Sequence, residues 1–165
     1  MNQNLEATDV RIDLKDKKFK FRVAGIVEHN GKILVVRLMQ NTFYCFPGGH
    51  VELLEDTYSA VKRELDEELY FKVNVEKLLY IHENFFKAEG KNFHELCFYF
   101  KCVPVDKDLK TDSVLWHEMD KGHEVTHRYV WIDKDKLDKE DIEPKDIIKR
   151  FINDDDKFEN FITRD

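Results

Sequence analysis

The sequence predicts an α/β fold, with a mixed central sheet enclosed by helices. Runs of β-branched and aromatic residues lie both before and after one acidic helical segment, residues 56–71. A second helical segment follows near the C-terminus, where apolar residues recur at helical spacing over residues 147–152. Strands on both sides of a helix form a sheet whose apolar faces need helices to cover them, which gives a layered α/β domain.

Length and composition restrict the class of protein further. The chain has 165 residues, and we expect a single domain over residues 1–165 with loose tails at residues 1–7 and 154–165. A formal charge of −7 argues against non-specific nucleic-acid binding, which needs clustered lysine and arginine. The sequence shows no apolar leader, no membrane-length apolar run and no metal-binding cysteine spacing. We therefore expect a reduced, cytoplasmic protein without a membrane partner.

The first half of the chain is predicted to supply the centre of the sheet. Residues 10–14 alternate apolar and charged side chains, as an edge strand does. Two long β-rich runs, residues 19–29 and 32–39, follow. They are joined at Asn30-Gly31, the strongest short-range signal for a β-hairpin.

The second half is predicted to add a hairpin, a last strand and a helix. Residues 72–86 and 92–105 are rich in aromatic and β-branched residues and should pair. Residues 106–128 are charged and without periodicity, so we expect a long surface loop there. A strand at residues 129–133 precedes the final helix, which Pro144 is suited to begin.

A glycine turn lies at the centre of the predicted functional region. A short apolar strand at residues 43–46 leads into Pro47-Gly48-Gly49, where glycines let the backbone turn tightly and approach a ligand. We expect the carbonyl oxygen of Gly48 to face a metal ion.

The acidic helix after this turn gathers like charges on one side. Asp56 or Thr57 can cap its first turn. At about 100° per residue, Glu64, Glu67 and Glu68 fall on one stripe, where their repulsion favours a bound cation, and all-oxygen ligands favour magnesium or manganese. An adjacent apolar stripe should face the core: Tyr58, Val61, Leu65 and Leu69.

The spacing of these residues resembles the signature of the Nudix hydrolases, which cleave a nucleoside diphosphate linked to another moiety. Gly49, Glu55 and residues 63–68 match every charged position of that signature. The chain departs from it at Leu54 and Tyr70, where the family commonly has glycine. The resemblance implies an α/β/α sandwich, a small nucleotide as substrate and Mg²⁺ as cofactor, with Mn²⁺ as a possible substitute.

The roles expected within the helix follow from this chemistry, since metal ions can both neutralise phosphate oxygens and activate water. Glu67 and Glu68 are the expected direct ligands, and Glu64 is either a ligand or a base that acts through water. Arg63 is expected to hold Glu55 in a bidentate ion pair. A pure capping role for Glu55 at the helix N-terminus is the alternative.

Outside the helix, several residues are candidates for the general base or for substrate binding. Glu95, Glu118 and Glu124 lie on a later strand or in the expected loop, and any of them could supply a base. Phe85 and Phe86 could stack on a nucleobase, although aromatic residues in such runs are more often part of the core.

Two other functional hypotheses stay open. The chain could be a nucleotide-binding or regulatory domain of the same fold without turnover, or an enzyme that removes RNA caps. The predicted N-terminal strand also offers a free edge through which a homodimer could form.

Overall fold

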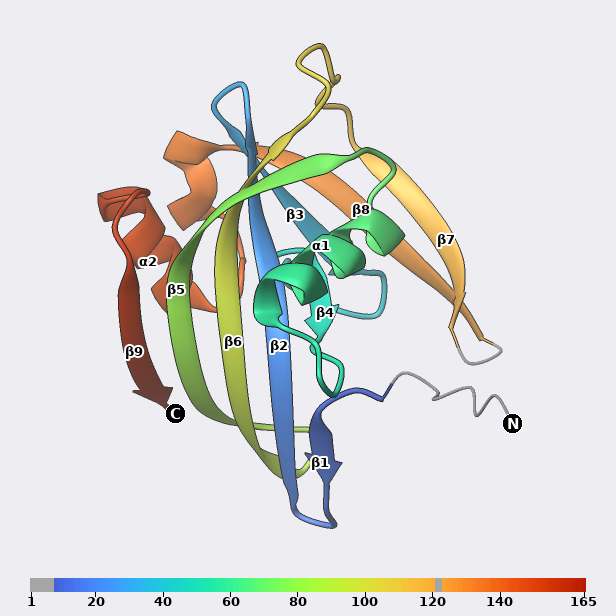
Figure 1. The fold of residues 1–165 in the computed structure, drawn as a ribbon, viewed down its shortest axis with the longest axis vertical. Helices are drawn as coiled ribbons and strands as arrows, with labels where there is room; N and C mark the ends of the chain where they lie inside the picture. The colour runs from blue at the N-terminus through green and yellow to red at the C-terminus, as the bar shows by residue number, and fades with distance from the viewer. Residues whose placement is uncertain (1–7, 121–122) are drawn as a thin grey trace.

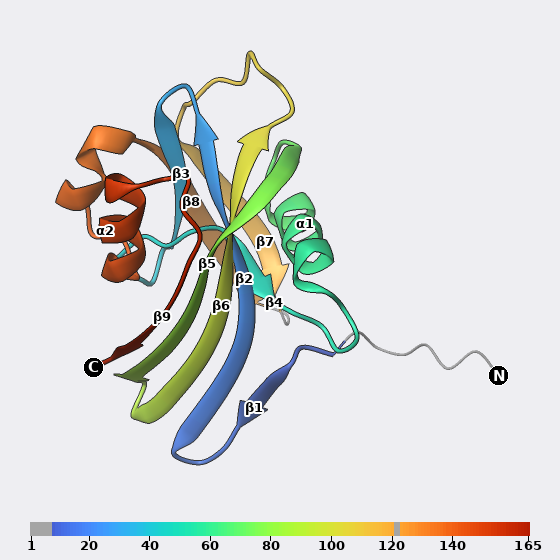
Figure 2. The same ribbon diagram turned by 60° about the vertical axis from the view of Figure 1, so that its left-hand side comes forward.

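The computed structural model describes residues 8–120 and 123–165, and within these residues the chain forms one nine-stranded sheet with helices on its two faces (Figures 1 and 2). The path through the sheet is β7-β8-β3-β2-β6-β5-β9, and β1 and β4 both pair with β2. The strands are β1 (Arg11–Asp13), β2 (Lys17–His29), β3 (Lys32–Leu38), β4 (Gly48–His50), β5 (Val73–Ala88), β6 (Lys91–Pro104), β7 (Val114–Asp120), β8 (His123–Asp133) and β9 (Glu159–Arg164).

The sheet is mixed, as the sequence predicts. β2 and β6 run parallel to each other, as do β5 and β9, whereas the other pairs are antiparallel. β2 and β3 form the expected hairpin at Asn30 and Gly31, whose φ angles of 50° and 73° are those of a turn that matches the strand twist. β5 and β6 form the second predicted hairpin, with Ala88 opposite Lys91 at its tip.

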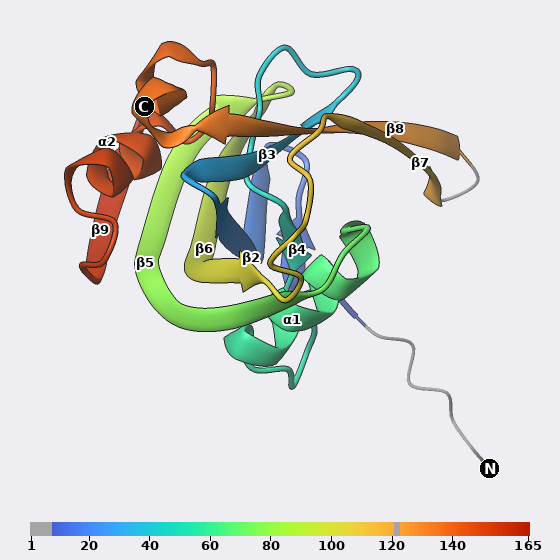
Figure 3. The same cartoon turned by 90° about the horizontal axis from the view of Figure 1, so that it is seen from above.

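Helices α1 (Thr57–Glu68) and α2 (Lys145–Asn153) cover opposite faces of the sheet (Figure 3). Side chains alternate along β2, so Val23 packs with residues of α1 while Ala24 packs with residues of α2. We call these two faces the α1 face and the α2 face. A short 3₁₀ helix, η1 (Lys134–Lys139), joins β8 to the segment before α2.

The predicted loop over residues 106–128 is wrong in large part. β7 and the first half of β8 occupy residues 114–120 and 123–128, where the two strands pair with each other, and residues 127–133 of β8 pair with β3. These strands were missed because their sequence lacks apolar alternation. Pairing of β7 with β8, and of β8 with the edge of β3, satisfies their backbone groups without such a pattern.

The predicted loose tail over residues 154–165 is wrong for residues 159–164, which form β9 beside β5. Phe161 on β9 packs against the core, and its neighbours Asn160 and Ile162 point outward, so the segment has the alternation of a half-buried strand. The tail expected at residues 1–7 lies outside the described residues.

Two smaller corrections concern the neighbourhood of α1. The strand expected at residues 43–46 is reduced to isolated bridges, and the regular pairing falls instead on β4, where a turn was expected. Tyr58 does not join the core with the rest of its stripe, since it is 50% exposed. Its ring lies edge-on to Phe100, with ring centroids 6.3 Å apart, and its hydroxyl donates a hydrogen bond to the Val75 carbonyl at 3.4 Å, so it covers the margin of the core.

His82 is buried at the seam between β5 and β9 and should give the fold a pH dependence. Its Nε2 lies 2.7 Å from Oγ1 of Thr163, and its ring stacks on Phe161. Burial lowers the pKa of His82 from its ordinary 6.5, so below that pH the unfolded chain binds a proton more readily than the folded protein does. Stability is therefore greatest above this pH and decreases as the pH falls.

We expect the urea midpoint to fall between about pH 7 and about pH 5, and His82→Phe to weaken this dependence because the group that must stay neutral is gone. Urea unfolding followed by circular dichroism at each pH measures it. His94→Phe, which keeps His82, is the control. An unchanged pH dependence in His82→Phe would assign the effect to other groups.

Candidate functional site

Helix α1 begins and ends at well-defined residues, and these ends fix the direction in which its acidic stripe points. Asp56 is the N-cap, and its Oδ1 accepts a hydrogen bond from the Ser59 amide at 2.9 Å. At the other end Leu69 leaves the helix in an extended conformation, so no glycine is needed at Tyr70. Leu54, where glycine is common in the family signature, has a positive φ of 68° and a fully exposed side chain.

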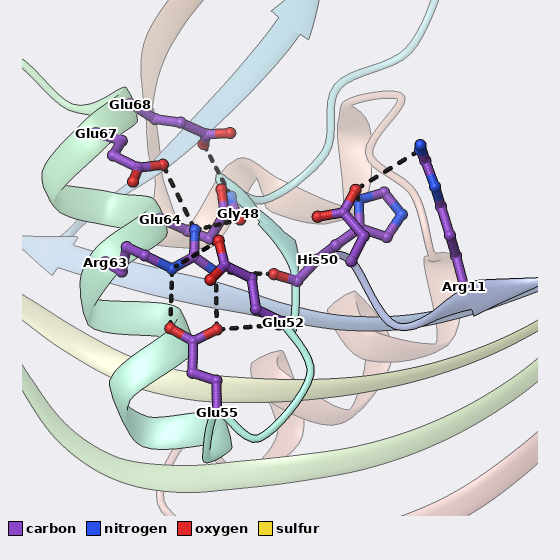
Figure 4. A network of polar contacts seen from close by, with 10 residues as sticks. Arg11, Gly48, His50, Glu52, Glu55, Arg63, Glu64, Glu67 and Glu68 are labelled. Atoms are coloured by element: carbon purple, nitrogen blue, oxygen red, sulfur yellow. Dashed lines mark hydrogen bonds and ion pairs between the residues drawn. The ribbon is translucent and has the colours of Figure 1, made fainter. Parts of the chain in front are cut away.

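The two glycines of β4 bring the backbone into contact with the acidic stripe. The Gly48 amide donates a hydrogen bond to Oε2 of Glu68 at 3.0 Å. A β-carbon on Gly49 would lie 2.2 Å from Cδ of Glu64, so only glycine leaves room for that carboxylate. Both helix residues therefore point toward β4 (Figure 4).

Arg63 lies at the centre of the carboxylates and contacts several of them (Figure 4). Its Nε and Nη2 donate to the two oxygens of Glu55 at 2.8 and 2.9 Å, which is the bidentate geometry expected from the sequence. Nη1 also donates to Glu64 at 3.0 Å, and Nη2 donates to the His50 carbonyl at 3.0 Å. Glu55 is thus held by Arg63 and by the Glu52 amide, and the helix cap belongs to another residue.

The electrostatics of these carboxylates follow from their surroundings. The hydrogen bonds from Arg63 hold the pKa of Glu55 below its usual range. Burial raises the pKa of Glu64, against the opposing effects of Arg63 and of the more distant Arg22. Glu64 therefore takes up a proton more readily than Glu55 does.

The carboxylates fit a hard divalent cation, although no group of three or more metal-binding side chains is already gathered among the described residues. Glu64 is engaged by Arg63, and Glu68 by the Gly48 amide. The donors are nevertheless all oxygens, three of them lie on one stripe, and Gly49 leaves space beside them. This donor set suits magnesium or manganese.

The candidates outside α1 are spread over the sheet. Glu95 is buried on β6, 3.8 Å from Arg22, and so already has a cationic partner. Glu118 and Glu124 lie on β7 and β8, with backbones paired to Val125 and Met119, but their side chains lie outside the described part of the chain.

The two candidate aromatic residues lie on opposite faces of the sheet. Phe85 stacks on His94 and lines a pocket of about 400 Å³ under β1, on the α1 face. Phe19 of β2 lines this pocket, and Val23, four residues further along the strand, pairs with Gly49. The pocket is therefore roughly 13 Å from Gly49 along β2. Phe86 stacks on Phe93 on the other face, with ring centroids 4.9 Å apart.

Sequence reasoning missed two groups beside the carboxylates. Arg22 pairs across the sheet with His50, and its charge acts on both Glu64 and Glu95. Burial, together with Arg22, lowers the pKa of His50 to about 4. The available signal was the alternation of basic and aromatic residues over residues 18–22 of β2, which places Lys18, Lys20 and Arg22 on one face.

Comparisons with known proteins agree with this geometry. The sequence model of the Nudix domain matches residues 19–151. No curated protein matches the chain. None of the described helices is long and apolar enough to cross a membrane.

Solved structures share the fold at low sequence identity. A Nudix hydrolase from Nitrosomonas europaea matches with a TM-score of 0.62 and 17% identity, over 93% of this chain and 82% of that one. A mutator MutT protein from Bacillus halodurans matches with a TM-score of 0.60 and 20% identity, over 88% and 90% of the two chains. A UDP-X diphosphatase matches with a TM-score of 0.57 and 17% identity, over 92% and 69%. With the family match over most of its length and this α/β/α architecture, the chain belongs to the Nudix family.

Proposed function

We propose that this protein is a magnesium-dependent pyrophosphohydrolase that cleaves the diphosphate of a nucleoside diphosphate linked to another moiety. One observation carries the proposal: Glu64 and Glu68 of the acidic stripe meet the two glycines of β4, with Arg63 among the carboxylates. A solvated acidic helix face would need neither the glycines nor the arginine.

Glu67 and Glu68 would hold the metal ion, together with the Gly48 carbonyl. When bound, Mg²⁺ supplies neutralisation of the phosphate oxygens and lowers the pKa of a water molecule. Mn²⁺ has similar oxygen preferences and could substitute.

Glu64 either joins the ligands or accepts the proton of the attacking water, directly or through a second water. Its burial raises its pKa, which makes its carboxylate a better proton acceptor. Arg63 fixes Glu55 and Glu64 relative to β4 and reduces the repulsion between the acidic side chains.

For a base outside α1, the pairing of Glu95 with Arg22 favours Glu118 and Glu124 over Glu95. We further propose a reduced, cytoplasmic location, which is supported by free thiols throughout the described residues. Burial raises the pKa of Cys97 to about 12, so this thiol is unreactive. A homodimer through β1 stays a prediction.

Arg63→Lys should lower kcat/KM by about 10- to 100-fold and raise the Mg²⁺ concentration needed for half-maximal rate. Lysine keeps the charge but cannot hold both oxygens of Glu55 at once. Initial rates over a magnesium titration measure the effect. The control is Lys62→Arg, on the exposed side of the same helix. An unchanged magnesium requirement in Arg63→Lys would show that Arg63 does not position the carboxylates.

The proposal is tested by a substrate screen with and without Mg²⁺. The panel contains nucleoside triphosphates, UDP-sugars, ADP-ribose and dinucleoside polyphosphates. Phosphate release is the readout, after treatment with inorganic pyrophosphatase for the triphosphates and with alkaline phosphatase for the other compounds, which that phosphatase cannot attack before they are cleaved. A structure named as an ADP-ribose pyrophosphatase from Streptococcus suis, with a TM-score of 0.56, adds one reason to include ADP-ribose. Binding without turnover on every compound would favour the non-catalytic alternative.

A further inference from the structure

The C-terminal end of α1 is closed without the glycine that the family signature commonly has at the position of Tyr70. A glycine there would let the chain cap the last carbonyl groups of the helix in a left-handed conformation. Instead, Leu69 leaves the helix with φ −93° and ψ 143°, and its amide donates a hydrogen bond to the Leu65 carbonyl at 3.0 Å. The carbonyl groups after Leu65 therefore need partners from outside the helix.

Tyr129 of β8 supplies a partner for the last carbonyl group of the helix. Its side chain is fully buried, and its hydroxyl donates a hydrogen bond to the Glu68 carbonyl at 3.0 Å. Nδ1 of His127, two residues earlier on the same strand, lies 3.5 Å from this hydroxyl. The hydroxyl thus reaches the backbone of a residue whose side chain is an expected metal ligand.

Aromatic side chains hold the segment just beyond α1 against the same strand. The ring of Tyr70 lies edge-on to that of Tyr129, with ring centroids 6.2 Å apart. Phe71 stacks on Trp131 with ring centroids 5.9 Å apart, and Nε1 of Trp131 donates to the Tyr70 hydroxyl at 3.4 Å. These contacts fix residues 70 and 71, whereas the Tyr129 hydroxyl acts on the last residue of α1 itself.

Glu68 is consequently held at two points. Its Oε2 accepts a hydrogen bond from the Gly48 amide at 3.0 Å, and its carbonyl accepts one from the Tyr129 hydroxyl. A helix end whose carbonyl groups lack partners frays, and fraying of the last turn would move Glu67 and Glu68 relative to β4. The position of both carboxylates therefore depends on β8 as well as on α1.

We infer that Tyr129 is a positioning residue of the metal site. Its hydroxyl fixes the last turn of α1, so that Glu67 and Glu68 are placed to bind one cation together. The inference rests on the proposed function, which assigns the metal ion to these carboxylates. Removal of a group that orients metal ligands without touching the metal typically weakens metal binding about 10- to 100-fold.

The test is equilibrium binding of Mn²⁺ to the whole chain without substrate, with free Mn²⁺ measured by electron paramagnetic resonance. Tyr129→Phe keeps the ring and removes the hydroxyl, so it should weaken Mn²⁺ binding about 10-fold. Incorporation of p-aminophenylalanine at position 129 keeps a hydrogen-bond donor at the same place. This substitution should restore the affinity to within about twofold of the wild-type value.

Tyr70→Phe is the matched control. It removes a hydroxyl from the same group of rings, two residues after Glu68, but leaves the hydrogen bond to the Glu68 carbonyl in place. Its Mn²⁺ affinity should stay within about twofold of the wild-type value. Equal weakening in Tyr70→Phe would assign the effect to packing of the rings and overturn the inference.

Three other results would also overturn the inference. The first is an unchanged Mn²⁺ affinity in Tyr129→Phe, and the second is a failure of p-aminophenylalanine to restore binding. The third is a Tyr129→Phe variant that does not fold, as judged by circular dichroism, because the hydroxyl would then serve the fold and not the metal site.

Metal binding decides the inference, and the substrate screen decides the proposed function. A wild-type protein that binds Mn²⁺ but hydrolyses no compound of the panel would contradict catalysis, and the comparison of the variants would still stand. Absence of Mn²⁺ binding to the wild-type protein would contradict both.

Where turnover is found, kinetics give a second readout. Tyr129→Phe should raise the Mg²⁺ concentration for half-maximal rate about 10-fold and keep kcat at saturating Mg²⁺ near the wild-type value. A loss of kcat that magnesium does not restore would show that the hydroxyl acts on the reaction and not on metal binding, and would overturn the inference.

Discussion

Glu67→Gln and Glu68→Gln are each expected to reduce magnesium-dependent hydrolysis by about 10³-fold or more, since a metal ion supplies several kcal/mol of transition-state stabilisation. An amide keeps the shape of each side chain but removes the charge that a hard cation requires. The fold should survive. The side chain of Glu67 is 61% exposed, and a glutamine oxygen at position 68 can still accept the hydrogen bond from Gly48.

The matched control is Asp66→Asn, which also removes a carboxylate charge from α1. Asp66 pairs with Lys72 at 3.0 Å, away from the acidic stripe, so this variant should keep nearly full activity. The measurement is the steady-state rate on a substrate found in the screen, with circular dichroism and thermal melting to verify folding. Wild-type rates in both glutamine variants would overturn the metal assignment.

Gly49→Ala is expected to lower activity by about 10²-fold or more without unfolding the protein, because a small misplacement of a catalytic group is costly. The added methyl would lie 2.2 Å from Cδ of Glu64, so this carboxylate must move away from β4. The backbone of Gly49 lies outside the positive-φ region, so alanine can adopt it. Kinetics and thermal melting on the same sample measure both effects.

Gly48→Ala should act on the fold instead. A β-carbon there would meet the Val23 carbonyl oxygen at 2.1 Å, and φ is 154°, so backbone must shift against backbone. Gly90→Ala is the control for a positive φ, since its β-carbon would enter open space.

Full activity in Gly49→Ala would show that Glu64 tolerates displacement and has no fixed role.

The parts of the fold that were predictable are those specified by local sequence. The hairpin at Asn30 and Gly31 is specified by residues that tolerate positive φ, and α1 by its cap and its apolar stripe. The acidic stripe and the pairing of Arg63 with Glu55 and Glu64 were predictable for the same reason, since these residues lie in α1 or within two residues of its start.

The parts that were missed depend on distant partners. β7 and β9 are strands because β8 and β5 offer them free edges, and nothing within their own sequences requires it. Arg22 was missed for a related reason, because only the pairing of β2 with β4 places it opposite His50.

The position of Arg63 has a consequence for how the chain folds before a metal ion binds. Because one guanidinium contacts Glu55, Glu64 and Glu67, part of the repulsion between these carboxylates is offset before any metal ion binds. We therefore expect the chain to fold without a metal ion, unlike zinc fingers, where binding energy is folding energy. With the function proposed above, a chelator should abolish hydrolysis without denaturing the protein.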